Sequence, residues 1–534
     1  MQDFKNSLKL TKFDLKRTWF SSLIWIVVLL ALTIFVVAVF TSLYGSSEDR
    51  VGMAETMQNP AMVAMVGPIF EPNNYTNGAM YAQMMLVFII ITVAIMNIFL
   101  IVNLTRKDEE SSRLEVVRSL PVGRLSKLCS AVVVCVIINI ILAILTALSL
   151  IILNIESMNI EGSILYAITI CVSGIFFGSI AALFSQLAST SRGAAAYSFI
   201  FLGISYFLRG VGDVSYELLS LISPLGLPLR TQIYVNNYWW PVTIIIVLTI
   251  IVTIIAFHLN LTRDLGAGLI AAKPGKTSAS EFMKTSLGLS VKLVKPILIG
   301  WGITILIIGI AYGSIFGDIE KFLDSSDLMK QIFLNNNKFT MAEQFMTTLM
   351  AISSTIVTLA TLLITVKIRS EEKKGRLESI YSKKVSRKKV LFNYIMLSFI
   401  ASIVFQFLYA LGLWGSAYVV MEEPILFMTV FKSAFYYLPA IWLMISIAVI
   451  LIAYIPKYTN FIWGFLGFSF FTVYIGKIAN LPSWILKIVP YNSIPQIPVE
   501  DANVIPLIVL TFIAFIIIIL AVNGYNKRDI LSQE

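Results

Sequence analysis

Apolar runs of 18 or more residues recur along the whole chain, and this feature limits its fold more than any other. A run of that length is what a helix needs to cross the hydrocarbon core of a bilayer. Only 13% of the 534 residues are charged and 58% are hydrophobic, whereas about a quarter of the residues in a soluble protein are charged. Barrel strands are about ten residues long and alternate polar with apolar side chains, so a transmembrane β-barrel is excluded. We therefore expect an all-α polytopic membrane protein.

The apolar runs predict twelve spans in two groups of six. The first group lies near 19–41, 80–104, 128–153, 163–187, 193–209 and 241–261, and the second near 296–316, 344–368, 390–416, 433–455, 458–477 and 503–523. Before the last span of each group, segments 208–240 and 478–502 are too long for turns and too mixed in polarity for full spans. We expect short re-entrant or interfacial helices there, with their backbone groups satisfied by protein or water.

The distribution of charge predicts the orientation. Segments 1–18, 105–127, 262–295 and 367–389 contain 5, 6, 6 and 10 lysines and arginines, whereas loops 42–79 and 317–342 are net acidic. In a twelve-span model all the basic segments fall on one side, which the positive-inside rule assigns to the cytoplasm. Both termini are then cytoplasmic. The net charge of +10 is explained by these loops, and we expect no nucleic-acid partner.

A charged segment occurs twice, 263 positions apart. Residues 106–128 and 369–391 share nine of 23 positions without a gap. Smaller matches recur at nearly the same offset: Tyr44-Gly45-Ser46 with Tyr312-Gly313-Ser314, Pro224 with Pro490, and Arg263-Asp264 with Arg528-Asp529. The repeat predicts two parallel six-span halves, residues 1–265 and 280–534, joined by a cytoplasmic linker at 266–279.

The duplicated segment has the features of a docking element. Glu109 and Arg113, like Glu372 and Arg376, have the i,i+4 spacing of a helical ion pair, so the preceding span is expected to extend into the cytoplasm. Glu115 and Glu378 would then be free to meet a partner. A turn at Pro121 or Lys384 would lead into a short helix that carries Arg124 or Arg387. An ordinary positive-inside loop explains the basic residues but not the repeated Glu-Arg-Leu-Glu pattern.

Residues 1–18 predict an amphipathic helix on the membrane surface. Its apolar side chains can share one face while lysines surround them, as in helices that bind anionic lipid, and a similar pattern returns at 284–295. A frayed basic tail is the alternative for 1–18.

The sequence Pro274-Gly275-Lys276-Thr277 resembles the end of a phosphate-binding loop. The first glycine of that motif is missing, because position 270 is Ile270, and no strand precedes it. We therefore expect neither an ATPase nor any other catalytic site in this chain, and no metal or cofactor of its own.

The pattern E-x-x-x-R-L-E followed by S-x-x-V-x-R resembles the cytoplasmic loop of ABC-2 type permeases. Over nearly its full length the chain resembles the double-length permeases identified as polyketide-antibiotic exporters. That resemblance implies a coupling helix between spans two and three of each half, which fits a cleft in a separate ATPase subunit. It assigns Glu109, Arg113, Glu115 and Arg124 to the first coupling segment (105–127), and Glu372, Arg376, Glu378 and Arg387 to the second (367–389). The copies differ at Ser112/Gly375 and Pro121/Lys384, which puts equal coupling by the two halves in question.

The resemblance also implies that spans two, five, eight and eleven line a central cavity. Candidate path residues are apolar, aromatic or weakly polar: Met84, Asn97, Phe199, Met346, Ser353 and Phe468. Such a surface suits hydrophobic or amphipathic drugs or lipid-like compounds, although ordinary helix packing explains these residues equally well.

We expect the permease of an ABC exporter in the cell membrane, with two copies of a partner ATPase that bind ATP and Mg²⁺. A proton-coupled twelve-span carrier is the alternative, although the spans contain few of the ionisable residues that such carriers use. A membrane-embedded transferase is a third possibility, but no cluster of Asp, Glu or His at a membrane face provides its acid, base or metal ligands.

Overall fold

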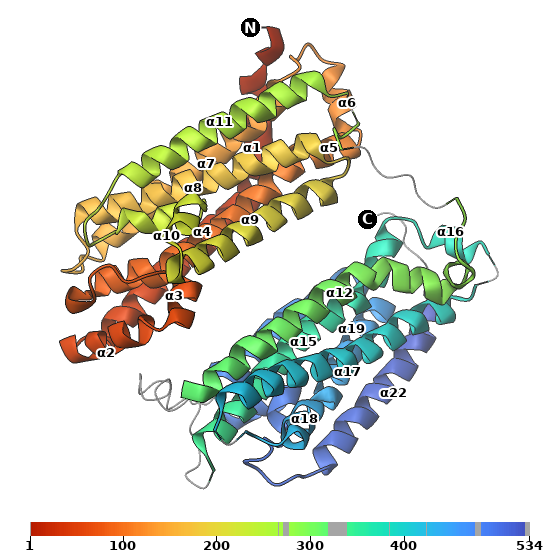
Figure 1. Cartoon of the computed structure of the whole chain (residues 1–534). Helices are drawn as coiled ribbons and strands as arrows, with labels where there is room; N and C mark the ends of the chain where they lie inside the picture. The colour runs from red at the N-terminus through yellow and green to blue at the C-terminus, as the bar shows by residue number, and fades with distance from the viewer. Residues whose placement is uncertain are drawn as a thin grey trace. The chain divides into compact units, whose positions relative to one another are not determined.

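The computed structural model describes residues 2–264, 266–270, 277–318, 339–383, 385–422, 424–475 and 482–528. Every regular element within these residues is a helix (Figure 1). Eleven described helices are long and apolar enough to cross a membrane. The chain is therefore an all-α polytopic membrane protein, as predicted. It divides into two compact units, Met1–Gly275 and Lys276–Glu534.

The first unit contains six long helices. They are α1 (Ser7–Leu43), α4 (Asn77–Leu104), α7 (Ser126–Ile152), α8 (Ile160–Leu187), α9 (Ser191–Val214) and α11 (Trp240–Thr262). Helix α8 is central and contacts α4, α7, α9 and α11. Small residues allow this approach: a Cβ on Gly174 would lie 2.4 Å from Asn139 Oδ1, and one on Gly178 would lie 2.7 Å from Cys135 Sγ. Close packing through small residues is the usual way in which helices associate inside a membrane.

The second unit repeats this plan. Its long helices are α12 (Ser286–Gly313), α15 (Met341–Lys373), α17 (Arg387–Val420), α19 (Leu438–Tyr454), which α18 (Phe427–Phe435) precedes, and α22 (Ile505–Lys527). Helices α12 and α17 pack through glycines, since a Cβ on Gly309 would lie 2.6 Å from the carbonyl oxygen of Tyr409. Helix α20 (Phe461–Ile475) corresponds to the predicted span 458–477. With 15 residues it is too short to be one of the eleven, and the end of the predicted span lies outside the described residues.

Short helices cover the ends of the long ones. In the first unit they are α2 (Ser47–Met57), α3 (Pro60–Val66), η2 (Pro72–Asn74), α10 (Glu217–Ile222) and η3 (Leu227–Thr231). In the second they include η5 (Ser314–Asp318), η6 (Pro456–Tyr458), α21 (Ser483–Ile488) and η7 (Pro490–Ser493). The predicted short helices within 208–240 and 478–502 are therefore present. Helices α2 and α3 were not predicted.

Some predicted features lie wholly or mostly outside the described residues. They are the phosphate-loop-like sequence 274–277, residues 271–276 of the linker 266–279, most of loop 317–342, Lys384 and Asp529.

The predicted surface helix at the N-terminus is wrong in form. Only η1 (Gln2–Phe4) is separate, and α1 runs from Ser7 through the first span without interruption. Its 37 residues are about 55 Å long at 1.5 Å per residue, well beyond the roughly 30 Å hydrocarbon core. The basic residues therefore continue the first span as one helix. Asp14 on this stretch is fully buried, so this part of the helix packs against the rest of the unit. Likewise α12, preceded by η4 (Glu281–Lys284), incorporates most of 284–295 and continues through Pro296.

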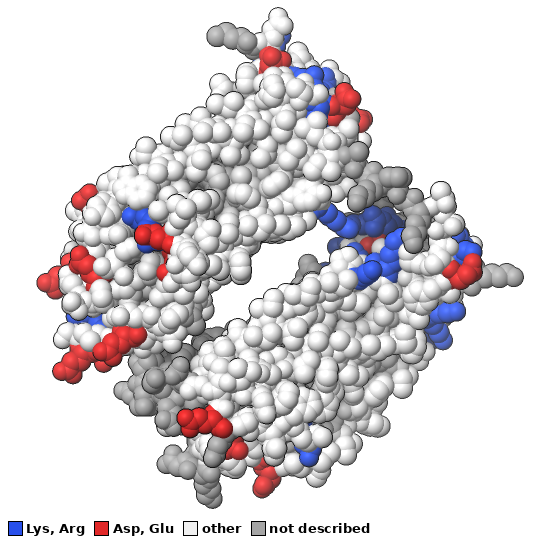
Figure 2. All heavy atoms as spheres, in the orientation of Figure 1, with Lys and Arg blue, Asp and Glu red and all other residues white. Residues whose placement is uncertain are grey.

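Charged side chains gather at the ends of each unit, and the flanks between them are largely free of charge (Figure 2). We call the end that contains residues 105–127 or 367–389 the basic end of its unit. At the opposite end of the first unit, Arg209 is fully buried and donates to the carbonyl oxygens of Val63 (3.4 Å) and Met65 (2.9 Å). Asp213 lies 3.5 Å from Arg209 and 3.3 Å from Arg230. These contacts join α3, α9 and η3, and Arg209 is the last residue of the predicted span 193–209.

Candidate functional site

The duplicated charged segments begin as continuations of α4 and α15. After Thr105 the chain forms α5 (Arg106–Glu110) and then α6 (Arg113–Arg118), whereas α15 continues to Lys373 before α16 (Glu378–Tyr381). The predicted helical extension of both spans is present, with an interruption at Thr105 in the first copy, and its cytoplasmic location stays a prediction. Equivalent residues turn the chain after it, because Ser112 has φ +57° and Gly375 has φ +67°. A left-handed residue ends the helix in each copy.

The predicted i,i+4 ion pairs do not form. Arg113 lies 3.7 Å from Asp108 instead of pairing with Glu109, and Arg376 lies 3.0 Å from Glu371 instead of pairing with Glu372. The left-handed residue between the partners breaks the helix, so the side chains are no longer neighbours on one face. The same alternative pairing forms in both copies, so the two segments turn in the same way after the helix.

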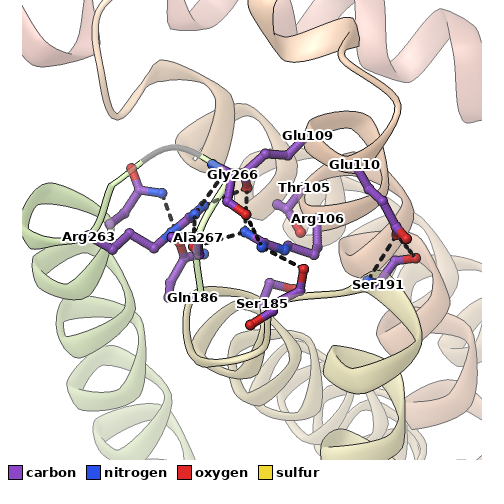
Figure 3. Close-up of polar contacts among 12 residues, drawn as sticks. Thr105, Arg106, Glu109, Glu110, Ser185, Gln186, Ser191, Arg263, Gly266 and Ala267 are labelled. Carbon is purple, nitrogen blue, oxygen red and sulfur yellow. Dashed lines mark hydrogen bonds and ion pairs between the residues drawn. The ribbon is translucent and has the colours of Figure 1, made fainter. Parts of the chain in front are cut away.

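Glu109 instead forms the centre of a buried cluster at the basic end of the first unit (Figure 3). Its two carboxylate oxygens accept from both terminal nitrogens of Arg263 at 2.7 Å. The backbone N–H of Gly266 adds a bond of 2.7 Å, and Arg106 lies 3.0 Å away. The side chains of Glu109, Arg263 and Arg106 are 6%, 7% and 2% exposed. We call Arg106, Glu109 and Arg263 the first cluster.

The first cluster holds the chain after α11 against the turn between α8 and α9. Arg106 donates to the carbonyl oxygens of Ser189 (2.7 Å), Gly266 (2.9 Å) and Ala267 (3.2 Å). Gln186 accepts from Nε of Arg263 at 2.7 Å, as Figure 3 also shows. Glu110 binds the N-terminus of α9 through the backbone N–H of Ser191 at 3.1 Å. Arginine is suited to this work because its fork of donors meets several acceptors at once.

The second unit has a corresponding second cluster, formed by Arg369, Glu372 and Arg528. One terminal nitrogen of Arg528 donates to both oxygens of Glu372 at 2.7 Å, and Arg369 lies 3.3 Å from Glu372. Tyr381 donates to or accepts from Tyr525 at 3.0 Å. Burial, and then the neighbouring Tyr525, raise the pKa of Tyr381, so this contact joins two neutral hydroxyls. In both units the end of the second long helix is therefore tied to the end of the last.

Arg124 and Arg387 also bind within their own unit. Arg124 donates to the carbonyl oxygen of Arg263 at 2.8 Å, and Arg387 donates to that of Arg528 at 2.9 Å. The short helix predicted to carry them is absent, because Arg124 lies before α7 and Arg387 is the first residue of α17. Burial, and then the charge of Arg124, lower the pKa of Arg118. An acidic group from a partner would relieve this repulsion.

One group of ionic contacts has no matching arrangement among the described residues of the second unit. Asp108 accepts from both terminal nitrogens of Arg17 at 3.1 and 2.7 Å, and lies 3.1 Å from Lys127. Lys127 also donates to Asp14 at 2.8 Å. These contacts tie α1 and α7 to α5. At the position equivalent to Asp108, Glu371 has described ion pairs only to residues near it in sequence, Lys367 and Arg376.

The short helix α6 presents an exposed surface at the basic end. Leu114 is 8% exposed and anchors the helix, whereas Val116 and Leu120 are 70% and 57% exposed. Glu115 is also exposed. In the second unit Leu377, just before α16, is the buried equivalent of Leu114, and Glu378 is exposed like Glu115. Leu120 lies in the turn after α6, so it does not share a helix face with Val116, but two apolar residues within this charged segment were a signal in the sequence that the charge-based reasoning missed.

The predicted path residues fall into two groups. Asn97, Met346 and Ser353 are 0%, 0% and 3% exposed, so they lie in the helix packing of their own unit. The amides of Asn97 and Asn139 donate to each other at 3.1 and 2.9 Å, which leaves Asn97 little capacity for a ligand. Met84 and Phe199 are half-buried and Phe468 is 39% exposed. A role of these six in transport stays a prediction.

Comparisons with known proteins agree with the repeat. The family described as "Multidrug efflux system permease Rv1217c, C-terminal domain" matches the chain twice, at residues 16–259 and 283–526. The multidrug efflux system permease protein Rv1217c of Mycobacterium tuberculosis (strain ATCC 25618 / H37Rv) is 27% identical over 533 residues, which cover 99% of this chain and 96% of that protein.

Proposed function

Since the chain belongs to the family of the multidrug efflux system permease Rv1217c, we propose that it is the permease of an ABC exporter. It moves hydrophobic or amphipathic compounds out across the cytoplasmic membrane, using ATP hydrolysed by separate subunits. The relative's name as a multidrug efflux permease supports the class of cargo. The resemblance of the duplicated segments to ABC-2 coupling loops supports the energy source. ATP and Mg²⁺ belong to the partner ATPase in this proposal.

The observation that carries the proposal is the exposed surface of α6 and of the turn that follows it. Val116 and Leu120 lie at the basic end, beyond the apolar flanks of the unit, yet Val116 is 70% exposed and Leu120 is 57% exposed. Exposed apolar side chains beside a charge, on an element anchored from beneath, are typical of a protein–protein contact. We assign α6 and α16 as the docking helices of two ATPase copies, one per unit. Both termini are then cytoplasmic, as the distribution of basic residues favours.

The buried clusters provide the route by which docking acts on the spans. Helix α6 follows α5 after the tight turn at Ser111–Ser112, and Glu109 on α5 is bound to Arg263 at the end of α11. A buried, hydrogen-bonded pair resists separation far more than an exposed one. A displacement of α6 by the ATPase is therefore delivered to α4 and α11 together, and ATP-driven closure moves the helices of one unit as a body between inward- and outward-facing states.

Charge reversal on the docking helices tests the proposal. The E115K/E378K double variant is expected to reduce co-purification of the ATPase about tenfold or more, because like charges across an interface cost several kcal/mol. Efflux of a fluorescent hydrophobic dye from vesicles is expected to fall with it. The matched control is E48K/E55K, which reverses two exposed glutamates on α2 at the opposite end. Undiminished ATPase capture and efflux in E115K/E378K would refute the docking role.

A proton-coupled carrier is the second candidate, and one observation favours it. Asp213 and Arg209 form a buried ionic contact inside a long helix, and buried ionisable residues within spans are typical of proton relays. This candidate requires transport without any ATPase and its collapse on addition of a protonophore. The Asp213→Asn variant would then lose transport while ATPase capture is unchanged, whereas E115K/E378K is expected to lose both.

A further inference from the structure

A pocket of about 230 Å³ lies beside the first coupling segment, entirely within the first unit. Its walls are α1 and α4, with contributions from α5, the start of α6 and one residue of α7. One end is lined by Arg17, Lys107 and Arg113, and the other by Trp25, Met96 and Phe99. The pocket therefore changes from cationic to apolar along its length.

The cationic end has more positive charge than its one lining carboxylate balances. Asp108 lines the pocket with Arg17, Lys107 and Arg113, and its oxygens are bound by Arg17 and Lys127. Arg113 is 68% exposed, and its described ion pair with Asp108 is long, at 3.7 Å. Lys107 is exposed and donates to Asn103 at 3.1 Å. Lys107 and Arg113 can thus turn toward an anion without breaking a buried pair.

The distance over which the pocket changes from charged to apolar is long enough to cross the headgroup layer of a membrane. Arg17 and Trp25 are eight residues apart on α1, and Lys107 and Phe99 are eight apart along α4 and α5. Eight helical residues span about 12 Å. The headgroup layer on each side of a bilayer is roughly 5–8 Å thick, so both walls pass from the headgroup level into the acyl region.

We propose that this pocket binds an anionic phospholipid from the leaflet next to the coupling segment. Lys107 and Arg113 bind its phosphate, and the apolar end takes the first part of one acyl chain. That this leaflet is the cytoplasmic one rests on the orientation proposed above. The pocket is smaller than the roughly 300–1,000 Å³ sites that enclose a drug-sized molecule. It suits one end of a long amphiphile whose other chain stays in the bilayer. Because Arg113 begins α6, the bound headgroup touches the docking helix.

Photocrosslinking of the full-length permease, without ATPase subunits, tests the site. The protein is reconstituted in phosphatidylcholine nanodiscs that contain a minor fraction of phosphatidylglycerol with a diazirine on its acyl chain. Crosslinks are expected on the peptides that contain Trp25 and Phe99. The K107Q/R113Q variant is expected to reduce them about fivefold per charge removed, because a basic residue near anionic lipid contributes about 1 kcal/mol. Unlabelled phosphatidylglycerol competes, whereas phosphatidylcholine and soluble glycerol phosphate do not.

Two further variants separate the site from general lipid contact. K373Q/R376Q removes the same charge from exposed positions of the second coupling segment and is expected to leave these crosslinks unchanged. S21F places a ring on an exposed serine that lines the pocket. It is expected to abolish the crosslinks with the charges intact, whereas S42F, near the far end of α1, does not. Wild-type crosslinking in both K107Q/R113Q and S21F, or equal loss in K373Q/R376Q, would overturn the proposal. Displacement by glycerol phosphate would also overturn it, because the site would then recognise a soluble anion.

Discussion

The first cluster offers the sharpest test of the structure, through the Glu109→Gln variant. Glu109 accepts two bonds of 2.7 Å from Arg263 and one of 2.7 Å from Gly266, with Arg106 at 3.0 Å. Glutamine keeps the shape of the side chain, but it has no charge, and its amide NH₂ group would face the N–H donors that now bind the carboxylate. Two arginines would then lie in a buried site without a carboxylate.

The expected cost is large because water screens these groups little. Glu109 and Arg263 are 6% and 7% exposed, and removing one partner of such a pair costs about 3–5 kcal/mol. The Arg263→Gln variant is expected to cost a similar amount. In the double variant only Arg106, instead of two arginines, is left without a carboxylate, so its cost is expected to fall short of the sum by at least about 1.5 kcal/mol.

The measurement is the free energy of unfolding in detergent, followed by tryptophan fluorescence across a denaturant titration, for wild type, both single variants and the double variant. Glu372→Gln tests the equivalent pair with Arg528 in the second unit, and a comparable loss is expected. A cost below about 1 kcal/mol for Glu109→Gln would refute the assignment of a buried ion pair, since that is the range of exposed pairs. Strict additivity in the double-mutant cycle would refute it as well.

Three other predictions concern single positions. Gly375→Ala is expected to lower stability by about 1 kcal/mol. The cost comes from the positive φ alone, since the new Cβ meets nothing within 4 Å. Ser112→Gly, at the equivalent left-handed residue, is expected to raise stability, and thermal unfolding measures both variants. Asn139→Leu leaves the Asn97 amide without its reciprocal partner and is expected to cost about 1–2 kcal/mol, part of which is regained when Asn97 is also replaced by Leu; recovery of none of it would contradict the amide pair. Arg209→Met removes a fully buried cation and two of its bonds to α3, so proteolysis between α3 and α4 is expected to accelerate markedly, and unchanged cleavage would contradict its role as an anchor.

The long helices could be predicted because a bilayer requires long apolar runs and the chain has them. The repeat also located the important residues, since Arg106, Glu109 and Arg263 all recur at matching positions in the second unit. Their pairing could not be read from local spacing. Glu109 and Arg113 satisfy the i,i+4 rule, but the rule assumes a continuous helix, and Ser112 has φ +57°. The partner chosen instead, Arg263, is 154 residues away.

The local sequence pattern also could not predict the form of the N-terminal segment. A helix with basic and apolar faces has the same sequence whether it lies along a membrane or stands upright at the end of a span. What decides between them is Asp14, whose carboxylate is buried against Lys127 and Ser130 of α7. The docking surface was predicted for its charge and not for its apolar side chains, because Val116 and Leu120 are unremarkable until the burial of Leu114 is known.

The residues after α11 that complete the first cluster have a consequence for biosynthesis. Its last contributors, Gly266 and Ala267, are followed by Leu269 and Ile270, which bond to the backbone of α8. The contacts described for the first cluster involve no residue beyond Ile270, so the first unit can close while at least the 264 residues 271–534 are still to be made. At about 5–20 residues per second the ribosome needs roughly 10–50 s for the remainder. Until Arg263 emerges, however, Glu109 lacks its two bonds of 2.7 Å to that residue and has only Arg106 as an ionic partner, so the nascent chain leaves this carboxylate incompletely paired at the membrane face. The sixth span is therefore the step at which the first unit can leave the insertion machinery, and a nascent chain stalled before Arg263 is expected to stay bound to that machinery longer than one stalled after Ile270.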